Sequence, residues 1–297
     1  MEKMKKVLLF ISVSAILFST MEVALKIASL DFDAFQMTFT RFLWGGMVLL
    51  PFAVKEFRKR SLRIKKDDLI YFMILGIINI VVSMTFFQYA VMYTNASSVA
   101  VVFCTNPMFT MLFAHFMTEE KMTRKKIMAL IISVIGLAFI MNPMHIRQPD
   151  DLLGITLAFA SSVTFGLYSA FGKRRVKRYG GIAQTSISFL LGAMVLLIFL
   201  IVMDKPIWGG IHLNNFLLIF YISVFVTGLG YLAYFMAMEH SDTSFASMVF
   251  FVKPALAPIV AVIILGEVIT WNVVLGIIFI LVGSYITLGT GNLLKKT

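Results

Sequence analysis

The segment from Leu69 to Thr118 contains no Asp, Glu, Lys or Arg in 50 residues. As one α-helix it would be about 75 Å long, far more than the roughly 30 Å of a bilayer's hydrocarbon core. It is therefore predicted to form two membrane helices joined by a turn at residues 93–97, where small polar residues interrupt the apolar pattern. The whole chain is 60% hydrophobic and 14% charged, whereas soluble domains are about 25% charged, so the composition disfavours a water-soluble enzyme.

Similar apolar runs fill the rest of the 297 residues, and most are about as long as a membrane helix requires. They predict an all-α integral membrane protein with ten transmembrane helices. The predicted spans are residues 7–28, 34–54, 69–92, 97–117, 126–143, 152–172, 182–203, 214–238, 243–265 and 271–290.

The charges between these spans predict the orientation, because cytoplasmic loops are enriched in Lys and Arg. With ten spans and the N-terminus inside, the outer loops hold only Arg147 and Lys205, and all other loop Lys and Arg residues fall inside. We expect a multi-pass protein of the cell (cytoplasmic) membrane with both termini cytoplasmic. The net charge of +11 then reflects topology and attraction to anionic lipids, and no nucleic-acid partner is expected.

The sequence also repeats itself at an offset of 147 residues. Matching pairs include Ser14 with Ser161, Lys26 with Lys173, Phe103 with Phe250, Pro107 with Pro254, Glu120 with Glu267 and Gly136 with Gly283. The repeat predicts two five-helix domains, residues 1–146 and 147–297. Because five is odd, the second copy enters the membrane inverted, as in many secondary transporters whose substrate site lies at the repeat interface. A duplicated bundle without transport activity is the alternative.

Several short motifs lie within or next to the predicted spans. They are Lys26, Arg41-Phe42 and Thr118-Glu119-Glu120-Lys121-Met122-Thr123 in the first half, and Gly228-Leu229-Gly230-Tyr231, Lys253-Pro254 and Leu265-Gly266-Glu267 in the second. With these motifs the chain resembles the EamA-type family of the drug/metabolite transporter superfamily over nearly its whole length. The first half departs from the Leu-Gly-Glu ending, because it lacks the glycine.

The resemblance implies a transporter with a central cavity between the first four helices of each half. It also implies that the fifth and tenth helices are peripheral and often at a dimer contact. Similar proteins move amino acids, sugars, nucleotide sugars, other metabolites or drugs. The expected partners are therefore a small-molecule substrate, the lipid bilayer and a second copy of the chain in a homodimer.

Lys253 is the basic residue placed deepest within a predicted span. A Lys at the centre of a membrane helix costs ~2.5 to 3.5 kcal/mol, so it normally faces a partner or a watery cavity. It directly precedes Pro254, whose missing N–H leaves a backbone carbonyl unpaired, and Pro258 repeats this break one turn later. Two interpretations follow: Lys253 binds a substrate carboxylate or phosphate, or it pairs permanently with a buried acid.

The first half carries Asn106-Pro107 at the place of Lys253-Pro254, which keeps the helix break and a polar group without the charge. The two half-sites are therefore chemically unequal, as recognition of an asymmetric ligand requires. Further candidate substrate-binding residues are Gln88, Tyr168, Tyr231 and Tyr234. Gly228 and Gly230 are predicted to allow a helix bend or a close helix approach.

Glu22, Lys26 and Arg41 are candidates for ion coupling or ion pairing. Glu22 and Lys26 lie one helical turn apart, which predicts a salt bridge on one face. A proton-accepting role is the alternative for Glu22, because an apolar environment favours the protonated carboxyl. Arg41 is predicted to reach the outer surface or Asp31 and Asp33 in a structural role.

These features together predict a secondary active transporter, an exporter or exchanger of a small polar metabolite such as an amino acid or related organic acid. A proton-coupled multidrug or cation efflux carrier is the alternative. A gradient is expected to supply the energy, since the chain has no Gly-x-x-x-x-Gly-Lys-Ser/Thr phosphate-binding loop. An enzyme is disfavoured, since the four His residues are scattered and no Gly-x-Ser-x-Gly or His-Glu-x-x-His motif occurs. No metal or cofactor is expected. A channel would need rings of similar groups, which a single Lys253 does not supply.

Overall fold

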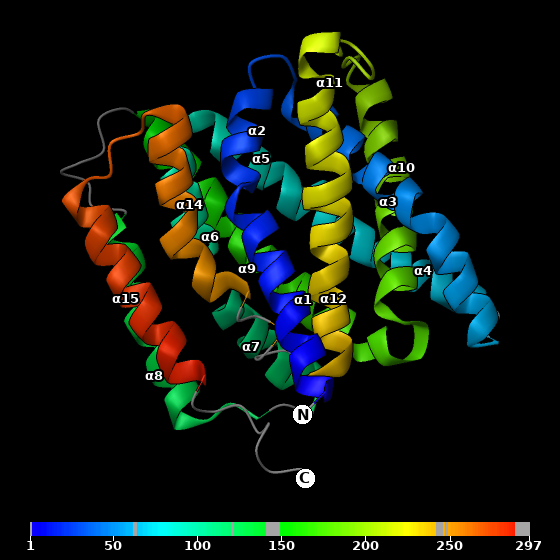
Figure 1. The fold of residues 1–297 in the computed structure, drawn as a ribbon, viewed down its shortest axis with the longest axis horizontal. Coiled ribbons are helices and arrows are strands. Elements are labelled where there is room, and N and C mark those ends of the chain that lie inside the picture. The colour runs from blue at the N-terminus through cyan, green and yellow to red at the C-terminus, as the bar shows by residue number, and fades with distance from the viewer. Residues whose placement is uncertain are drawn as a thin grey trace.

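The structure, a computed structural model, describes residues 2–61, 64–119, 121–140, 149–241, 246 and 249–288. Within these ranges the chain is helical, without β-strands (Figure 1). The elements, of which η1 and η3 are π-helical, are α1 (Glu2–Ser19), α2 (Met21–Ala28), α3 (Ala34–Lys59), α4 (Lys66–Gly76), η1 (Ile77–Met84), α5 (Thr85–Tyr93), α6 (Ala96–Phe103), α7 (Asn106–Met117), α8 (Arg124–Ile140), α9 (Pro149–Tyr179), α10 (Gly181–Val202), α11 (Leu213–Phe220), η3 (Tyr221–Gly230), α12 (Tyr231–His240), α14 (Val249–Leu265) and α15 (Trp271–Leu288).

Several of these elements join end to end into longer rods, such as α4, η1 and α5. Seven helices among the described residues are long and apolar enough to cross a membrane, so the chain is a multi-pass membrane protein. The predicted turn at 93–97 is confirmed, since α5 ends at Tyr93 and α6 begins at Ala96. The predicted spans at 126–143, 243–265 and 271–290 correspond to the shorter helices α8, α14 and α15, so the count of ten remains a prediction. The predicted domain boundary at 146 lies outside the described residues.

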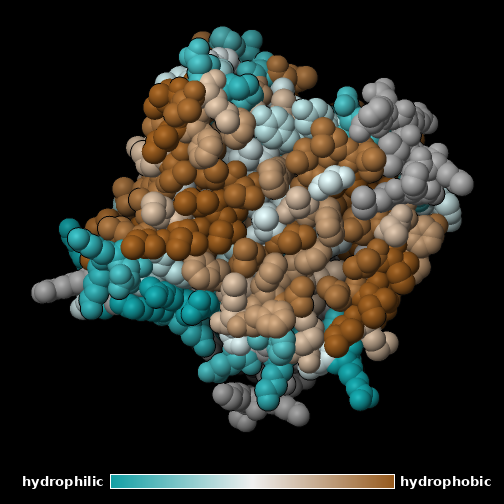
Figure 2. Space-filling model, turned by 180° about the vertical axis from the view of Figure 1, so that it is seen from behind, coloured by the Kyte–Doolittle hydropathy of each residue, from teal (hydrophilic) through white to brown (hydrophobic). Residues whose placement is uncertain are grey.

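The outer surface fits a lipid environment. Large apolar side chains such as Phe52, Ile198 and Ile263 are exposed. Figure 2 shows apolar residues over the middle of one face and hydrophilic residues towards its ends. Lipid tails would cover such a band, because it is far more extensive than the apolar patches of soluble proteins. At one edge of the bundle α8 and α15 pack together (Figure 1), with Phe139 stacked on Phe279 at 5.2 Å between ring centroids.

The sequence repeat is visible in matching contacts. Lys26 Nζ donates hydrogen bonds to the carbonyl oxygens of Val91 (2.7 Å) and Thr94 (3.0 Å) at the end of α5. Lys173 Nζ donates to two carbonyl oxygens at the same sequence separations, 65 and 68 residues, at the end of α12. Each lysine thus binds carbonyls that the last turn of a helix leaves without intrahelical donors.

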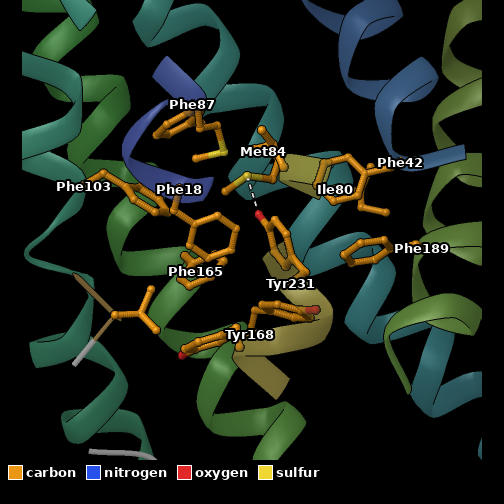
Figure 3. Packing of buried hydrophobic residues seen from close by; sticks show 14 of the residues in the cluster. Phe18, Phe42, Ile80, Met84, Phe87, Phe103, Phe165, Tyr168, Phe189 and Tyr231 are labelled. Carbon is orange, nitrogen blue, oxygen red and sulfur yellow. Dashed lines mark hydrogen bonds between the residues drawn. The ribbon is translucent and has the colours of Figure 1, made fainter. Parts of the chain in front are cut away.

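The two copies meet at the centre of the bundle (Figure 3). The Tyr231 hydroxyl contacts the sulfur of Met84 at 2.9 Å, and these residues are 147 positions apart. Phe42 and Phe189 are also repeat equivalents, and their rings pack edge to face at 4.7 Å. Side chains that contact their own repeat equivalents must lie close to the axis relating the two copies. The aromatic cluster in Figure 3 therefore marks the seam between the copies.

The two π-helical segments occupy equivalent places beside this seam. Ser14 Oγ donates to the carbonyl of Gly230 (2.9 Å), and its equivalent Ser161 donates to the carbonyl of Ser83 (2.7 Å). Wider π-helical turns are frequent at functional sites. Gly228 and Gly230 lie within η3, and the predicted close helix approach is found at Gly228, where an added Cβ would lie 3.6 Å from Gly45 Cα on α3.

The predicted proline breaks differ between the two copies. In the first copy α6 ends at Phe103 and α7 begins at Asn106, with Pro107 in its first turn, where proline is tolerated. In the second copy Pro254 and Pro258 lie inside α14, which continues through both. The prediction that they interrupt the helix is therefore wrong, although each still lacks an N–H donor.

We expect Gly76→Ala to destabilise the bundle, because a Cβ there would clash with the Ser188 carbonyl oxygen and lie 2.7 Å from Gly192 Cα. Overpacking of this kind costs about 1–3 kcal/mol. Gly228→Ala is the matched control, since its nearest neighbour would be 3.4 Å away. Thermal unfolding of the purified variants measures both. Equal unfolding temperatures would contradict the close approach of α4 and α10.

Candidate functional site

A buried ion pair lies at the centre of the bundle. Lys253 Nζ on α14 contacts Glu22 Oε1 on α2, and the two side chains are 0% and 1% exposed. The partners come from different copies of the repeat. Taking two charges out of water is expensive, and only close contact with an opposite charge offsets the cost. Each residue is therefore the counter-ion that the other needs.

Aromatic rings complete the surroundings of the Lys253 ammonium. Its nitrogen lies 5.0 Å from the ring centroid of Phe103 and 5.5 Å from that of Phe87. Both distances are within the roughly 6 Å range of cation–π attraction. In Figure 3 these two rings lie next to Phe18 and Phe165 in the aromatic cluster. The site therefore holds a cation between a carboxylate and ring faces.

The predicted salt bridge between Glu22 and Lys26 is wrong. Glu22 is buried and faces Lys253, whereas Lys26 is half-buried and donates to backbone carbonyls at the end of α5. Both lysines need acceptors away from water, and the helix end already supplies them to Lys26. Of the two interpretations of Lys253, the structure contains the contact with a buried acid.

Arg41 is a second buried cation near this pair, and its predicted surface position is wrong. Its side chain is 0% exposed, with Nη1 3.7 Å from the sulfur of Met21 and Cζ 4.8 Å from the ring centroid of Phe42. The Glu22 carboxylate is close enough to attract the Arg41 guanidinium electrostatically. Arg41 therefore belongs to the centre of the bundle.

The acids that were predicted to receive Arg41 have other partners. Asp33 pairs with Lys205 Nζ at 3.1 Å, and Asp31 accepts a hydrogen bond from Asn215 at 2.9 Å. Both contacts lie where α2, α3 and α11 meet, at the end of the bundle opposite the N-terminus (Figure 1). The turn between α2 and α3 is thus fixed by neighbouring polar groups, while α3 directs Arg41 inward.

The predicted amide ligands have different roles. Asn106 Nδ2 donates to the carbonyl of Phe103 at 2.7 Å, so it stabilises the break between α6 and α7. Gln88 is 0% exposed, and neither of its amide atoms finds a hydrogen-bond partner among the described residues. A buried amide without partners costs free energy, so Gln88 is available to a bound ligand or water.

The three predicted tyrosines all point into the core. Tyr231 contacts Met84 on the seam, and Tyr234 donates to Ser169 Oγ at 3.0 Å. Tyr168 packs beside Phe165 at 5.6 Å between ring centroids. The structure therefore brings Lys253 and the three tyrosines to the same aromatic cluster, and Gln88 follows Phe87 of that cluster on α5. No group of His, Cys, Asp or Glu side chains that could hold a metal occurs in the described ranges.

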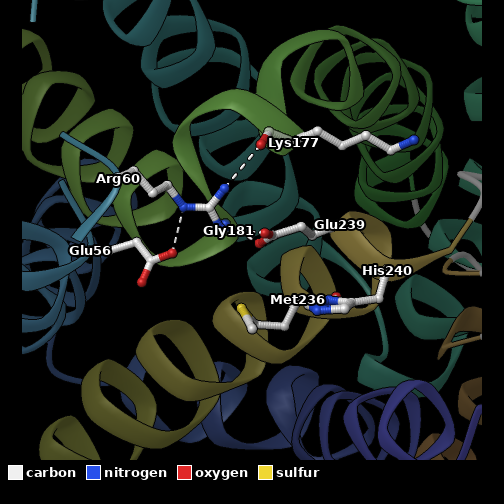
Figure 4. Close-up of polar contacts among 7 residues, drawn as sticks. All are labelled: Glu56, Arg60, Lys177, Gly181, Met236, Glu239 and His240. Carbon is white, nitrogen blue, oxygen red and sulfur yellow. Dashed lines mark hydrogen bonds and ion pairs between the residues drawn. The ribbon is translucent and has the colours of Figure 1, made fainter. Parts of the chain in front are cut away.

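An ionic network joins the two copies (Figure 4) at the end of the bundle that carries the N-terminus (Figure 1). Arg60 contacts Glu56 at 2.5 Å, Glu239 at 2.6 Å and the carbonyl of Lys177 at 3.0 Å. Glu239 Oε2 also accepts the N–H of Gly181 at 2.8 Å, at the start of α10. The network thus connects α3 with α9, α10 and α12.

Sequence reasoning did not identify this network. In the sequence, Arg60 is one of many basic loop residues, and these residues predict only the orientation of the chain in the membrane. An acid directly after an apolar run, as at Glu239, is the signal that would have pointed to a partner. Its location could not be inferred, because Arg60 and Glu239 are 179 residues apart in the chain.

The opposite end is joined by Glu267 of the Leu-Gly-Glu motif. Its carboxylate accepts the N–H groups of Ala96 (2.7 Å) and Ser97 (3.0 Å) at the start of α6. A negative charge is favourable there, because helix N-terminal N–H groups lack intrahelical partners. Gly266 has φ +66, which glycine adopts without strain. Glu120, which is the repeat equivalent of Glu267, lies outside the described residues.

We expect Lys253→Met to lower the free energy of unfolding by about 3–5 kcal/mol, because it removes the cation that contacts the buried Glu22 carboxylate. Adding Glu22→Gln should restore most of the loss, since the double variant buries no charge at either position. Thermal and denaturant unfolding of the single and double variants measures the coupling. Additive effects would contradict the ion pair.

Comparisons with known proteins agree with this architecture. The EamA-like transporter family matches residues 5–142 and again residues 152–289. An uncharacterized transporter of Clostridium kluyveri is 41% identical over 99% of this chain and 97% of its own length. The protein PagO of Salmonella typhimurium is 22% identical over 99% of this chain and 96% of its own.

A solved crystal structure shows the same fold. It has a TM-score of 0.72 and 16% sequence identity, and the match covers 98% of this chain and 99% of the other. The family match extends over both halves of the sequence, in agreement with the repeated contacts around the seam. The chain therefore belongs to the EamA-like transporter family.

Proposed function

We propose that the protein is a secondary active transporter, an exporter or exchanger of a small polar metabolite such as an amino acid or related organic acid. The observation that carries the proposal is the buried Glu22–Lys253 pair at the seam of the two copies. Ionisable groups inside a membrane protein characteristically mark substrate or ion pathways. A substrate carboxylate would be attracted to the two cations beside Glu22, Lys253 and Arg41.

The proposed mechanism is alternating access. Ten helices in two inverted halves, residues 1–146 and 147–297, would rock about the seam in the cytoplasmic membrane, with both termini cytoplasmic. The Arg60–Glu239 network would open on one side and the Glu267 contacts on the other. The energy would come from a gradient, without a cofactor or an enzymatic step. A homodimer would form through the edge at α8 and α15.

One observation favours a second candidate, a proton-coupled efflux carrier for drugs or organic cations. The Lys253 ammonium already lies between the Glu22 carboxylate and the rings of Phe87 and Phe103. A lipophilic cation could replace the ammonium in the same surroundings. Glu22 would then alternate between that cation and a proton.

Flux into proteoliposomes tests both candidates. We expect saturable uptake and counterflow for at least one of the radiolabelled probes L-alanine, L-phenylalanine and L-lactate. We expect no uptake with Glu22→Gln/Lys253→Met, whose folding is checked by its thermal unfolding. Tetraphenylphosphonium flux driven by a proton gradient would favour the second candidate. Flux that rises linearly with concentration would indicate a channel and contradict a carrier.

Alternating access makes a separate prediction for Cys104, which is buried beside the seam and is the chain's sole cysteine. We expect Arg60→Gln to raise its alkylation rate several-fold from the side that carries Arg60, because the variant loses the contacts to Glu56 and Glu239. Lys59→Gln removes a neighbouring exposed charge and is the control. An unchanged rate, or labelling from the opposite side, would contradict a gate at Arg60.

A further inference from the structure

We infer that Arg41 binds the carboxylate of a monoanionic ligand whose remaining body is apolar or aromatic. The inference deepens the proposed function and rests on it for the ligand's being a transported molecule. Four observations carry it: the balance of charge at the centre, the unpaired edge of the guanidinium, the apolar side chains around it, and the absence of a matching cation in the second copy.

The balance of charge leaves one positive charge unmatched. Glu22, Arg41 and Lys253 are each no more than 1% exposed, and Glu22 is in contact with Lys253. The other buried acid among the described residues is Asp68. It binds Tyr179, far along the bundle near the basic residues of α9. With all three groups ionised, the described residues give the centre a net charge of +1.

The geometry of the guanidinium identifies the kind of anion. Nη1 faces the sulfur of Met21, a weak acceptor, at 3.7 Å. Nε and Nη2 have no hydrogen-bond partner among the described residues. These two nitrogens form one edge of the guanidinium, and such an edge binds both oxygens of a carboxylate with two parallel hydrogen bonds.

Water alone does not satisfy this site. A water molecule accepts a hydrogen bond from Nε or Nη2 but leaves the buried positive charge uncompensated, which is costly away from bulk solvent. Binding of a carboxylate supplies both the acceptors and the charge. Because Lys253 is paired with Glu22, Arg41 would be the counter-ion of the ligand, and one guanidinium favours a single negative charge.

The surroundings of Arg41 determine the rest of the ligand. The guanidinium lies over the ring of Phe42, which packs against Phe189 and Tyr231 at centroid distances of 4.7 and 5.7 Å. Figure 3 shows these three rings close together, with the Tyr231 hydroxyl directed towards Met84. A ligand body next to the carboxylate therefore meets aromatic and thioether groups, which favour apolar contacts.

The second copy does not duplicate the site. The repeat equivalent of Arg41 is Ser188, whose hydroxyl bonds to the carbonyl of Gln184 in its own helix at 2.7 Å. We therefore expect one anion per chain.

Binding to the purified full-length protein in nanodiscs, without a gradient, tests the inference. Three probes of similar shape differ in charge: benzoate, benzamide and benzylammonium, with sodium chloride as the small-anion comparison. We expect benzoate to raise the unfolding temperature in a saturable manner with one site per chain. Stabilisation by benzylammonium or benzamide to the same extent would overturn the assignment of an anion site. Equal stabilisation by chloride would overturn the inference that the ligand has an apolar body.

Three variants identify the residue. Arg41→Gln should weaken benzoate binding about tenfold or more, the loss expected for charge-assisted hydrogen bonds. Arg41→Lys keeps the charge and should retain part of the affinity. Lys205→Gln is the control, because that cation is already paired with Asp33. Wild-type affinity in Arg41→Gln would overturn the assignment.

Two further readouts keep the result interpretable. Arg41→Gln removes an uncompensated charge, so its ligand-free unfolding temperature should not fall, and a fall would contradict the charge balance. Flux without benzoate binding would overturn this inference alone. Benzoate binding without flux of any probe would overturn the proposed transporter and leave Arg41 as an anion site.

Discussion

The free energy of keeping charged groups away from water governs the centre of this protein. Glu22, Arg41 and Lys253 lie where the two copies of the repeat meet, and each is almost completely buried. Glu22 and Lys253 neutralise each other, and the Arg41 guanidinium then has no carboxylate in contact among the described residues. A counter-ion for this third charge would stabilise the bundle, which is the physical basis of the ligand site proposed at Arg41.

The repeat is symmetric in its backbone and asymmetric in its chemistry. Lys26 and Lys173 bind equivalent helix ends, and the two π-helical segments occupy equivalent places. At the centre, by contrast, the equivalents of Glu22, Arg41 and Lys253 are uncharged: Ser169, Ser188 and Asn106. In the proposed mechanism, two copies with similar backbones would exchange conformations of similar energy, and the unequal side chains would orient the ligand.

Both ends of the seam are joined by carboxylates that reach across the copies. Glu239 accepts hydrogen bonds from Arg60 and from the start of α10, and Glu267 accepts from the start of α6. Each uses backbone N–H groups at a helix N-terminus, where an acid is favourable at small entropic cost. The Leu-Gly-Glu motif therefore has a structural explanation at the end opposite the Arg60 network.

The sequence by itself determined the helices, the turn between α5 and α6, and the repeat, because hydropathy and turn residues act over a few neighbouring positions. It also identified Lys253 as a residue that needs a partner. Only the tertiary structure decided that the partner is Glu22, 231 positions away, and that Arg41 points inward and not towards Asp31 or Asp33. The physical reason is that the rotation of each helix depends on its packing against distant helices, as where Gly76 meets Gly192, and local patterns carry no record of that packing.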